Sequence, residues 1–180
     1  MPTGTGITAD TPVNLVVGAG VVLRNHAFFG ASVDNNSFAV ERTLFTPELN
    51  GIMGDLQGTD YINRSVGRLE TTIPEVSAAV IEAGIPGAAL DTSTPGMTII
   101  SDATSRRIPD ASYADWELDI DRLNGGQFQF EVDNAINTGS FEGELQDDGL
   151  FAPRYILAGR LSAAAPSASP WRIRILDVAS

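Results

Sequence analysis

Apolar and polar residues alternate along several short stretches of the chain, as they do in β-strands. Residues 13–23 (VNLVVGAGVVL) form an apolar run rich in β-branched side chains, which favours a strand over a helix. Residues 37–44 (SFAVERTL) alternate, with Phe38, Val40 and Leu44 on one face. Residues 67–73 (GRLETTI) alternate again, with Leu69, Thr71 and Ile73 on one face. The order of these two stretches predicts a β-hairpin with a long loop at its tip.

The rest of the chain predicts one helix and more short strands. A helix over 74–84 is favoured because Pro74 suits a first helical turn and Gly84 supplies a stop. The further strands are 97–101, 115–123, 127–133, 154–161 and 171–178. This pattern predicts an α+β, mainly β fold in one domain over 1–180: an antiparallel β-sandwich flanked by one α-helix. A polar arm (1–12) precedes it, and a low-complexity link (162–170) leads to the last strand.

The segment 46–65 (TPELNGIMGDLQGTDYINRS) has no helix or strand period over its 20 residues. A structureless loop of this length in a compact domain normally indicates either a functional segment or a mistaken assignment. Its apolar side chains have no core of their own in the sequence pattern, so they predict a surface for a partner. The candidates for this contact are Leu49, Ile52, Met53, Leu56 and Tyr61.

Residues 115–123 and 127–133 predict an acidic hairpin around the loop Asn-Gly-Gly. Pairing centred on Gly125 sets Asp119 opposite Glu131 and Glu117 opposite Asp133. Like charges in direct opposition cost about 0.2–1 kcal/mol per pair, so stability alone would not select them. The face is either a solvated, solubilising surface or one that repels a polyanion or binds a cation. Its polar residues are Asp115, Glu117, Asp119, Asp121, Gln127, Gln129, Glu131 and Asp133.

Composition restricts the function classes. All eleven basic residues are arginine, there is no cysteine, and the formal net charge is −12. The absence of lysine removes P-loop and Schiff-base chemistry, and the absence of cysteine removes thiol catalysis. The negative charge argues against binding to the nucleic-acid backbone, although nucleic acid can still slide past such a surface. With no signal peptide and no long apolar run, we expect a soluble, non-secreted protein.

Motifs for catalysis or ligand binding are weak. VVGAGVVL begins like a dinucleotide-binding turn, but Leu23 stands where the third glycine would be. His26 is the single histidine, so a His-pair metal site is impossible, and Asp147 and Asp148 lack EF-hand spacing. We therefore expect no catalytic residue, no cofactor and no metal. A structural or assembly protein is favoured over a carboxylate-only hydrolase.

The order of several motifs resembles a known family. FFGASVDNNSFAVERT, GIMGDLQGTDYI and GRLETTIPEVSAAVIEAGIPG are similar to the N-terminal half of major tail proteins (tail tube proteins) of long-tailed, non-contractile bacteriophages. FEVDNAINTGSFEGELQDDG and the terminal PWRIRILDV continue the resemblance through the C-terminal half. It covers most of the chain from about residue 13 onward.

The resemblance implies a β-sandwich subunit of a homohexameric ring. Two hairpins, 37–44 with 66–73 and 115–123 with 127–133, would join an inner β-barrel around the DNA channel. The loop 46–65 would stack the rings into a tube, and the acidic face would line the channel. The implied partners are the chain itself, other tail proteins at the tube ends, and DNA that passes without specific binding; no membrane is implied.

The implied location is the virion, after synthesis in the host cytoplasm. The alternative from another class is a non-catalytic β-sandwich module that binds carbohydrate or calcium.

Overall fold

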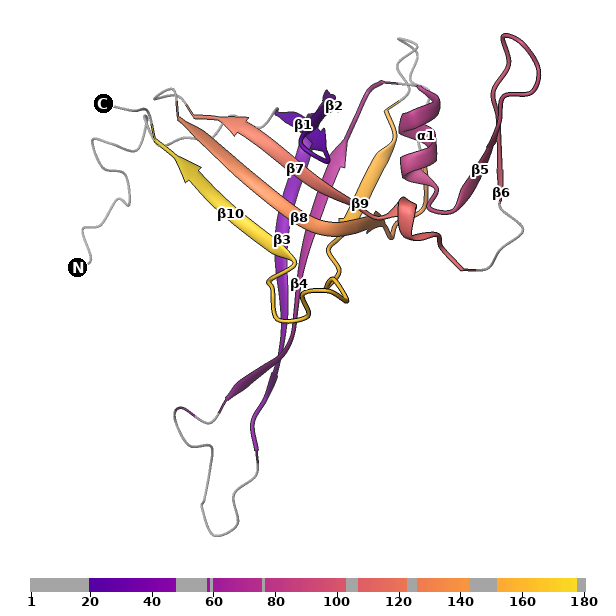
Figure 1. Ribbon diagram of the computed structural model, residues 1–180. Coiled ribbons are helices and arrows are strands. Elements are labelled where there is room, and N and C mark those ends of the chain that lie inside the picture. The colour runs from indigo at the N-terminus through magenta and orange to yellow at the C-terminus, as the bar shows by residue number, and fades with distance from the viewer. Residues whose placement is uncertain are drawn as a thin grey trace.

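The computed structural model describes residues 20–47, 58, 60–75, 77–102, 107–122, 126–142 and 152–177 (Figure 1). The strands are β1 (Val21–Arg24), β2 (Ala27–Ala31), β3 (Val33–Phe45), β4 (Tyr61–Thr72), β5 (Ala88–Asp91), β6 (Ile99–Asp102), β7 (Ala114–Asp121), β8 (Gln127–Asn137), β9 (Arg154–Ala158) and β10 (Trp171–Leu176). The α-helix of this part is α1 (Ala78–Gly84), and a short 3-10 turn is η2 (Asp110–Ser112). The predicted mainly β class is confirmed, and the described strands form antiparallel sheets without a closed barrel.

Eight strands form one sheet that divides at β8. The order is β2-β1-β7-β8-β9-β4-β3, and β10 also pairs with β8. Residues 127–132 of β8 pair with both β7 and β10, and Ala135 still pairs with β7, whereas the end of β8 pairs with β9 through Ile136 and Asn137. One part of the sheet therefore contains β2, β1, β7, β8 and β10, and the other contains β9, β4 and β3. In Figure 1, the long strands β3 and β4 cross the direction of β8 and β10.

Both parts of the sheet contribute to one hydrophobic core. Phe38 of β3 stacks on Phe130 of β8 with ring centroids 5.0 Å apart, and Trp116 of β7 lies 6.1 Å from Tyr155 of β9. Gly67 permits this close packing, because a Cβ there would lie 2.4 Å from Cβ of Trp171. The fully buried members of the core include Val22, Leu69, Ile73, Val80, Leu118, Val132 and Leu157.

The helix begins later than the sequence predicts. It starts at Ala78 rather than at 74, because Ser77 adopts an extended conformation and its side chain accepts a hydrogen bond from the Val80 N–H. The helix is attached to the sheet at both ends. Tyr155 Oη donates to the Val80 carbonyl at 2.6 Å, and Asn137 Nδ2 donates to the Gly84 carbonyl at 2.7 Å.

Strands β3 and β4 form the predicted hairpin, and it is longer than the alternating pattern indicates. The pairing of Phe38 with Leu69 continues through Arg42 with Ser65 to Phe45 with Tyr61. Residues 61–65 are therefore strand and not loop, which corrects the boundary of the predicted 46–65 segment. A β-bulge between Thr43 and Leu44 interrupts the alternation, which explains why the pattern was missed.

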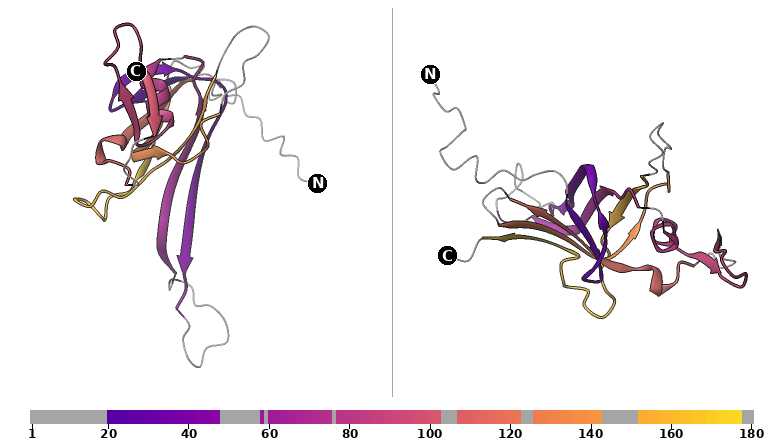
Figure 2. Two further views of the ribbon diagram at one scale, coloured as in Figure 1. Left: turned by 90° about the vertical axis from the view of Figure 1, so that its right-hand side faces the viewer. Right: turned by 90° about the horizontal axis from the view of Figure 1, so that it is seen from above.

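The outer half of this hairpin projects from the body of the molecule (Figure 2). We call residues 41–45 and 61–65 the arm. The predicted contacts Leu49, Ile52, Met53 and Leu56 lie outside the described residues, as does the N-terminal arm 1–12.

Two smaller features complete the described chain. Strands β5 and β6 form a separate two-stranded sheet beside α1 (Figure 1). The link 162–170 has no strand and contains a single bridge between Ser162 and Ala165. In these ranges, no helix has the length and apolar character that crossing a membrane requires.

Candidate functional site

The β7–β8 hairpin separates apolar from polar side chains as predicted, but its register differs. Trp116, Leu118 and Ile120 are buried on the core face. On the other face Glu117 pairs with Glu131 and Asp119 pairs with Gln129, which corrects both predicted pairs by two residues. A two-residue shift leaves every side chain on its own face, so the hydrophobic pattern cannot distinguish the two registers.

The acidic face is partly neutralised by β10, which the sequence reasoning did not place there. Arg172 pairs with Glu131 in the sheet, and its Nε lies 2.9 Å from Glu131 Oε2. Arg174 Nη1 lies 2.7 Å from the other oxygen, Oε1 of Glu131. Arg172 also donates to Asp133 Oδ1 at 2.6 Å. Glu131 is only 3% exposed, so these contacts compensate a carboxylate that has lost its water.

Glu117 also has a partner on this face. The β1–β2 turn consists of Asn25 and His26, which adopt left-handed φ values of 51° and 62°. This geometry brings His26 Nδ1 into an ion-pair contact with Glu117 Oε1. Asn25 fastens the turn to β7, because its Oδ1 accepts from the Asp115 N–H at 3.0 Å. Glu117 is therefore covered and does not form an open acidic surface.

Asp115, Asp119 and Asp121 make no ion pair among the described residues. Asp115 Oδ1 accepts from the Asn134 N–H at 2.9 Å, and Asp121 Oδ1 accepts from Gln127 Nε2 at 3.2 Å. Asp119 is hydrogen-bonded by Gln129. The eight predicted polar residues thus share one face, but its negative charge is concentrated at Asp115, Asp119 and Asp121.

Burial changes the protonation of two carboxyls on this face. Burial raises the pKa of Asp119 above its ordinary value of 3.8, and the charges of Glu117 and Asp121 raise it further. Burial also raises the pKa of Glu131, although Arg172 and Arg174 oppose that shift. The folded protein therefore holds these protons at pH values where the unfolded chain has released them. As a result, stability from these groups is lost as the pH rises from about 4 through the raised pKa values.

We expect Asp119→Asn to be more stable than the wild type at pH 7, because the amide removes a carboxylate charge that burial disfavours. The advantage should shrink as the pH falls through the raised pKa of the folded state, and Asp119 is protonated in both states only below 3.8, the ordinary pKa of the unfolded chain. Thermal unfolding from pH 4 to 8 measures this difference. Asp102→Asn, at an exposed position of β6, is the matched control. A difference that does not vary with pH would contradict the assignment.

The arm carries four uncovered apolar side chains, two on each face of the hairpin, which we call the arm patch. It consists of Leu44, Phe45, Tyr61 and Ile62, whose exposed fractions are 59%, 57%, 64% and 57%. Tyr61 is the one described member of the predicted loop contacts, and it lies on β4. Leu44 and Ile62 are direct partners across the hairpin. Single exposed apolar residues are common, but four on one projecting hairpin indicate a contact surface.

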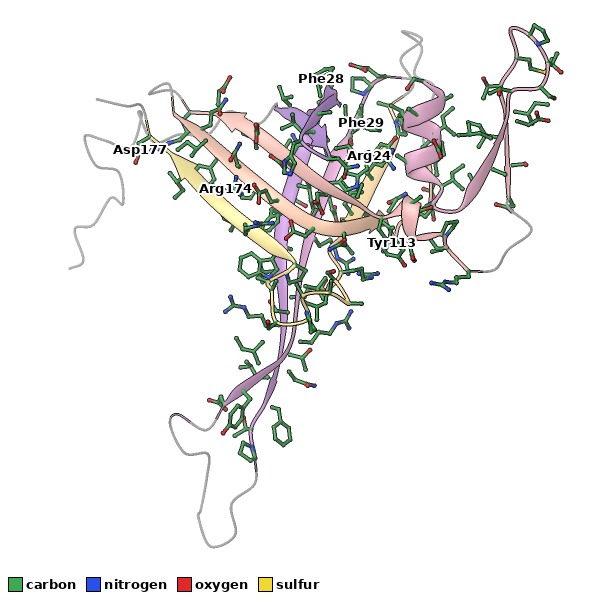
Figure 3. The ribbon with its side chains drawn as sticks, viewed as in Figure 1. Arg24, Phe28, Phe29, Tyr113, Arg174 and Asp177 are labelled. Carbon is green, nitrogen blue, oxygen red and sulfur yellow. The ribbon has the colours of Figure 1, made fainter. Side chains whose placement is uncertain are left out.

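Three strands of the described sheet have one unpaired edge: β2, β3 and β10. Phe28 on β2 and Arg174 on β10 mark the two outer strands of one part of the sheet (Figure 3). Ile173 and Ile175 are 45% and 56% exposed on β10. Unpaired edges with apolar side chains favour pairing with another chain.

The part of the chain that the structure describes offers no metal centre. It contains no group of three or more His, Cys, Asp or Glu side chains that could hold a metal ion. No family model matches the sequence, and no curated protein matches it significantly. Sequence reasoning missed Arg172 and Arg174 on the acidic face and Leu44 and Phe45 on the arm. The alternation WRIRIL carried a signal for the arginines, but not for their position beside β8.

Proposed function

We propose that this protein is the structural subunit of a bacteriophage tail tube, which self-assembles into stacked rings around a DNA channel. The observation that carries the proposal is the arm patch, since four large apolar side chains project from the body without cover. Such a surface is costly for a monomer and favourable for an assembling subunit. The motif order described above supports the choice of this family.

The unpaired edges supply the lateral contacts in this proposal. Six copies join through them, so that the parts of the sheet that contain the β3–β4 and β7–β8 hairpins complete an inner β-barrel and each subunit is a β-sandwich. Ring closure removes edges that would otherwise aggregate. The arm then joins one ring to the next, and a repeated head-to-tail contact between rings extends without limit into a tube.

The acidic face forms the channel wall in this arrangement. Asp115, Asp119 and Asp121 repel DNA phosphates, because none of them is in an ion pair among the described residues, and the nearby charge of Arg174 favours the charged form of Asp119. Repulsion acts over about 10 Å at 0.1 M salt, so only carboxylates on the wall affect the passing DNA. The protein has no catalytic role and needs no cofactor. It functions in the virion with other tail proteins at the tube ends.

Electron microscopy and analytical ultracentrifugation of the purified protein test this proposal. We expect rings or hollow filaments whose amount rises with protein concentration. A protein that stays monomeric at all concentrations and binds a carbohydrate or calcium saturably would instead be a binding module.

A further inference from the structure

A groove lies at the base of the arm, between β4 and the segment 159–171. Its volume is about 580 Å³. Arg42, Arg64 and Arg160 line it, together with the apolar side chains of Ile62, Leu161 and Trp171. Trp171 forms a fixed part of the wall, because its Nε1 donates to Ser65 Oγ at 2.9 Å. We call this cavity the arginine groove.

The charge of the arginine groove is opposite to that of the whole protein. The net charge is −12, yet none of the described residues that line this groove carries a carboxylate. None of the ion pairs between described residues includes Arg42, Arg64 or Arg160. Arg42 lies over the Trp171 ring at 5.6 Å, and Arg160 donates to the carbonyls of Ala158 and Gly159. Three guanidinium groups therefore converge there without an anion from the described chain.

The residues that line the groove also determine which kind of segment can bind in it. Guanidinium groups bind carboxylates through paired hydrogen bonds. Ile62 and Leu161 are 57% and 56% exposed, so the same groove offers apolar contact. The occupant that fits is a segment that carries carboxylates and apolar side chains and no basic residue.

We propose that the arginine groove binds residues 46–60 of a second copy of this chain. That segment (TPELNGIMGDLQGTD) contains Glu48, Asp55 and Asp60, no basic residue, and four large apolar side chains. It connects the two strands at the far end of the arm whose base holds the groove. Each copy thus carries a donor segment that joins the two strands of the arm and a receiving groove along the arm itself, lined by Arg42, Ile62 and Arg64. This inference rests on the proposed function and names the partner surface for stacking.

The contact is heterologous, so every bound copy leaves one free segment and one free groove. Repetition of the same contact adds copies in one direction without closing. The acidic and apolar components of the segment meet the arginines and apolar walls of the same cavity. Charge complementarity then sets the orientation of the arms as well as their affinity.

A charge-swap experiment with the full-length protein tests this contact. The groove variant is Arg64→Glu with Arg160→Glu, and the segment variant is Glu48→Arg with Asp55→Arg. We expect each variant alone to raise the critical concentration for assembly at least about 100-fold, because like charges then meet in the groove. An equimolar mixture should assemble again, since each groove then meets a segment of opposite charge. Arg107→Glu with Arg154→Glu reverses two exposed arginines outside the groove and should assemble as the wild type does.

The outcomes separate this inference from the proposed function. The proposed contact is overturned if the groove variant assembles normally, or if the mixture of the two variants fails to assemble. In either case, tubes formed by the wild type would still support the proposed function. If the segment instead docks in the groove of its own chain, the mixture of the two variants should likewise fail to assemble. If the wild type never assembles, the proposed function fails.

A synthetic peptide of residues 46–60 tests the groove independently of assembly. We expect it to bind the wild-type protein saturably, and both the groove variant and a peptide with Gln or Asn at the acidic positions should abolish binding. Absence of peptide binding would overturn the inference. Binding of inorganic polyphosphate or short duplex DNA in preference to the peptide at 0.15 M salt would also overturn it.

Discussion

Replacing the arm patch with serine is expected to leave a folded protein that no longer assembles. In the variant Leu44→Ser, Phe45→Ser, Tyr61→Ser and Ile62→Ser, the core is unchanged, because all four side chains are more than half exposed. Full burial of such a side chain at an interface contributes about 1.5–3 kcal/mol. Loss of four of them should raise the critical concentration at least about 1,000-fold, since about 1.4 kcal/mol is a factor of ten. Light scattering and electron microscopy measure assembly, and circular dichroism monitors the fold.

The control for this variant replaces exposed apolar residues away from the arm. Leu90→Ser with Met97→Ser removes two partly exposed side chains, one on β5 and one between β5 and β6. We expect this control to assemble at the wild-type concentration. Filaments of the arm variant at wild-type concentration would refute the role of the arm patch.

Removing the two arginines beside Glu131 is expected to destabilise the fold. In Arg172→Met with Arg174→Met, the buried carboxylate of Glu131 loses both cations that contact it. A buried charge left without its partner costs about 3 kcal/mol. Urea unfolding at pH 7 measures this loss. The loss should become smaller as the pH is lowered, because protonation of Glu131, whose pKa burial raises, removes the unpaired charge.

A third substitution, at Glu131 itself, is expected to restore the stability lost in the double variant. Adding Glu131→Leu to the double variant should restore most of the stability, since no buried charge then remains without a partner. Arg107→Met removes an arginine from an exposed pair and should change stability little. A triple variant as unstable as the double would show that the arginines act through packing rather than through Glu131.

This buried pairing also affects how the channel wall should be tested. Replacing Glu131 with arginine would place a third cation beside Arg172 and Arg174 and disturb folding. Asp121 is exposed and makes no ion pair among the described residues, so it is the cleaner position at which to reverse the wall charge.

Features that depend on neighbouring residues in the chain could be read from the sequence. Alternation along 115–133 correctly assigned Trp116, Leu118 and Ile120 to the core, because successive side chains of a strand point to opposite faces. The β3–β4 hairpin followed from two such patterns on either side of a turn-rich segment. The predicted start of α1 was wrong because proline and serine are both acceptable near a helix start, and in the folded protein Ser77 is the N-cap.

By itself, the sequence determined the mainly β class, the two hairpins and the two faces of the acidic hairpin, since these follow from local periodicity. Only the tertiary structure decided the register of β7 and β8, because a two-residue shift preserves every face. It alone placed Arg172 and Arg174 beside Glu131, across 41 and 43 residues of chain. Contacts between distant strands depend on how the whole sheet folds, and no local pattern encodes them. The arginine groove has the same origin, because its walls come from β3, β4 and the segment before β10.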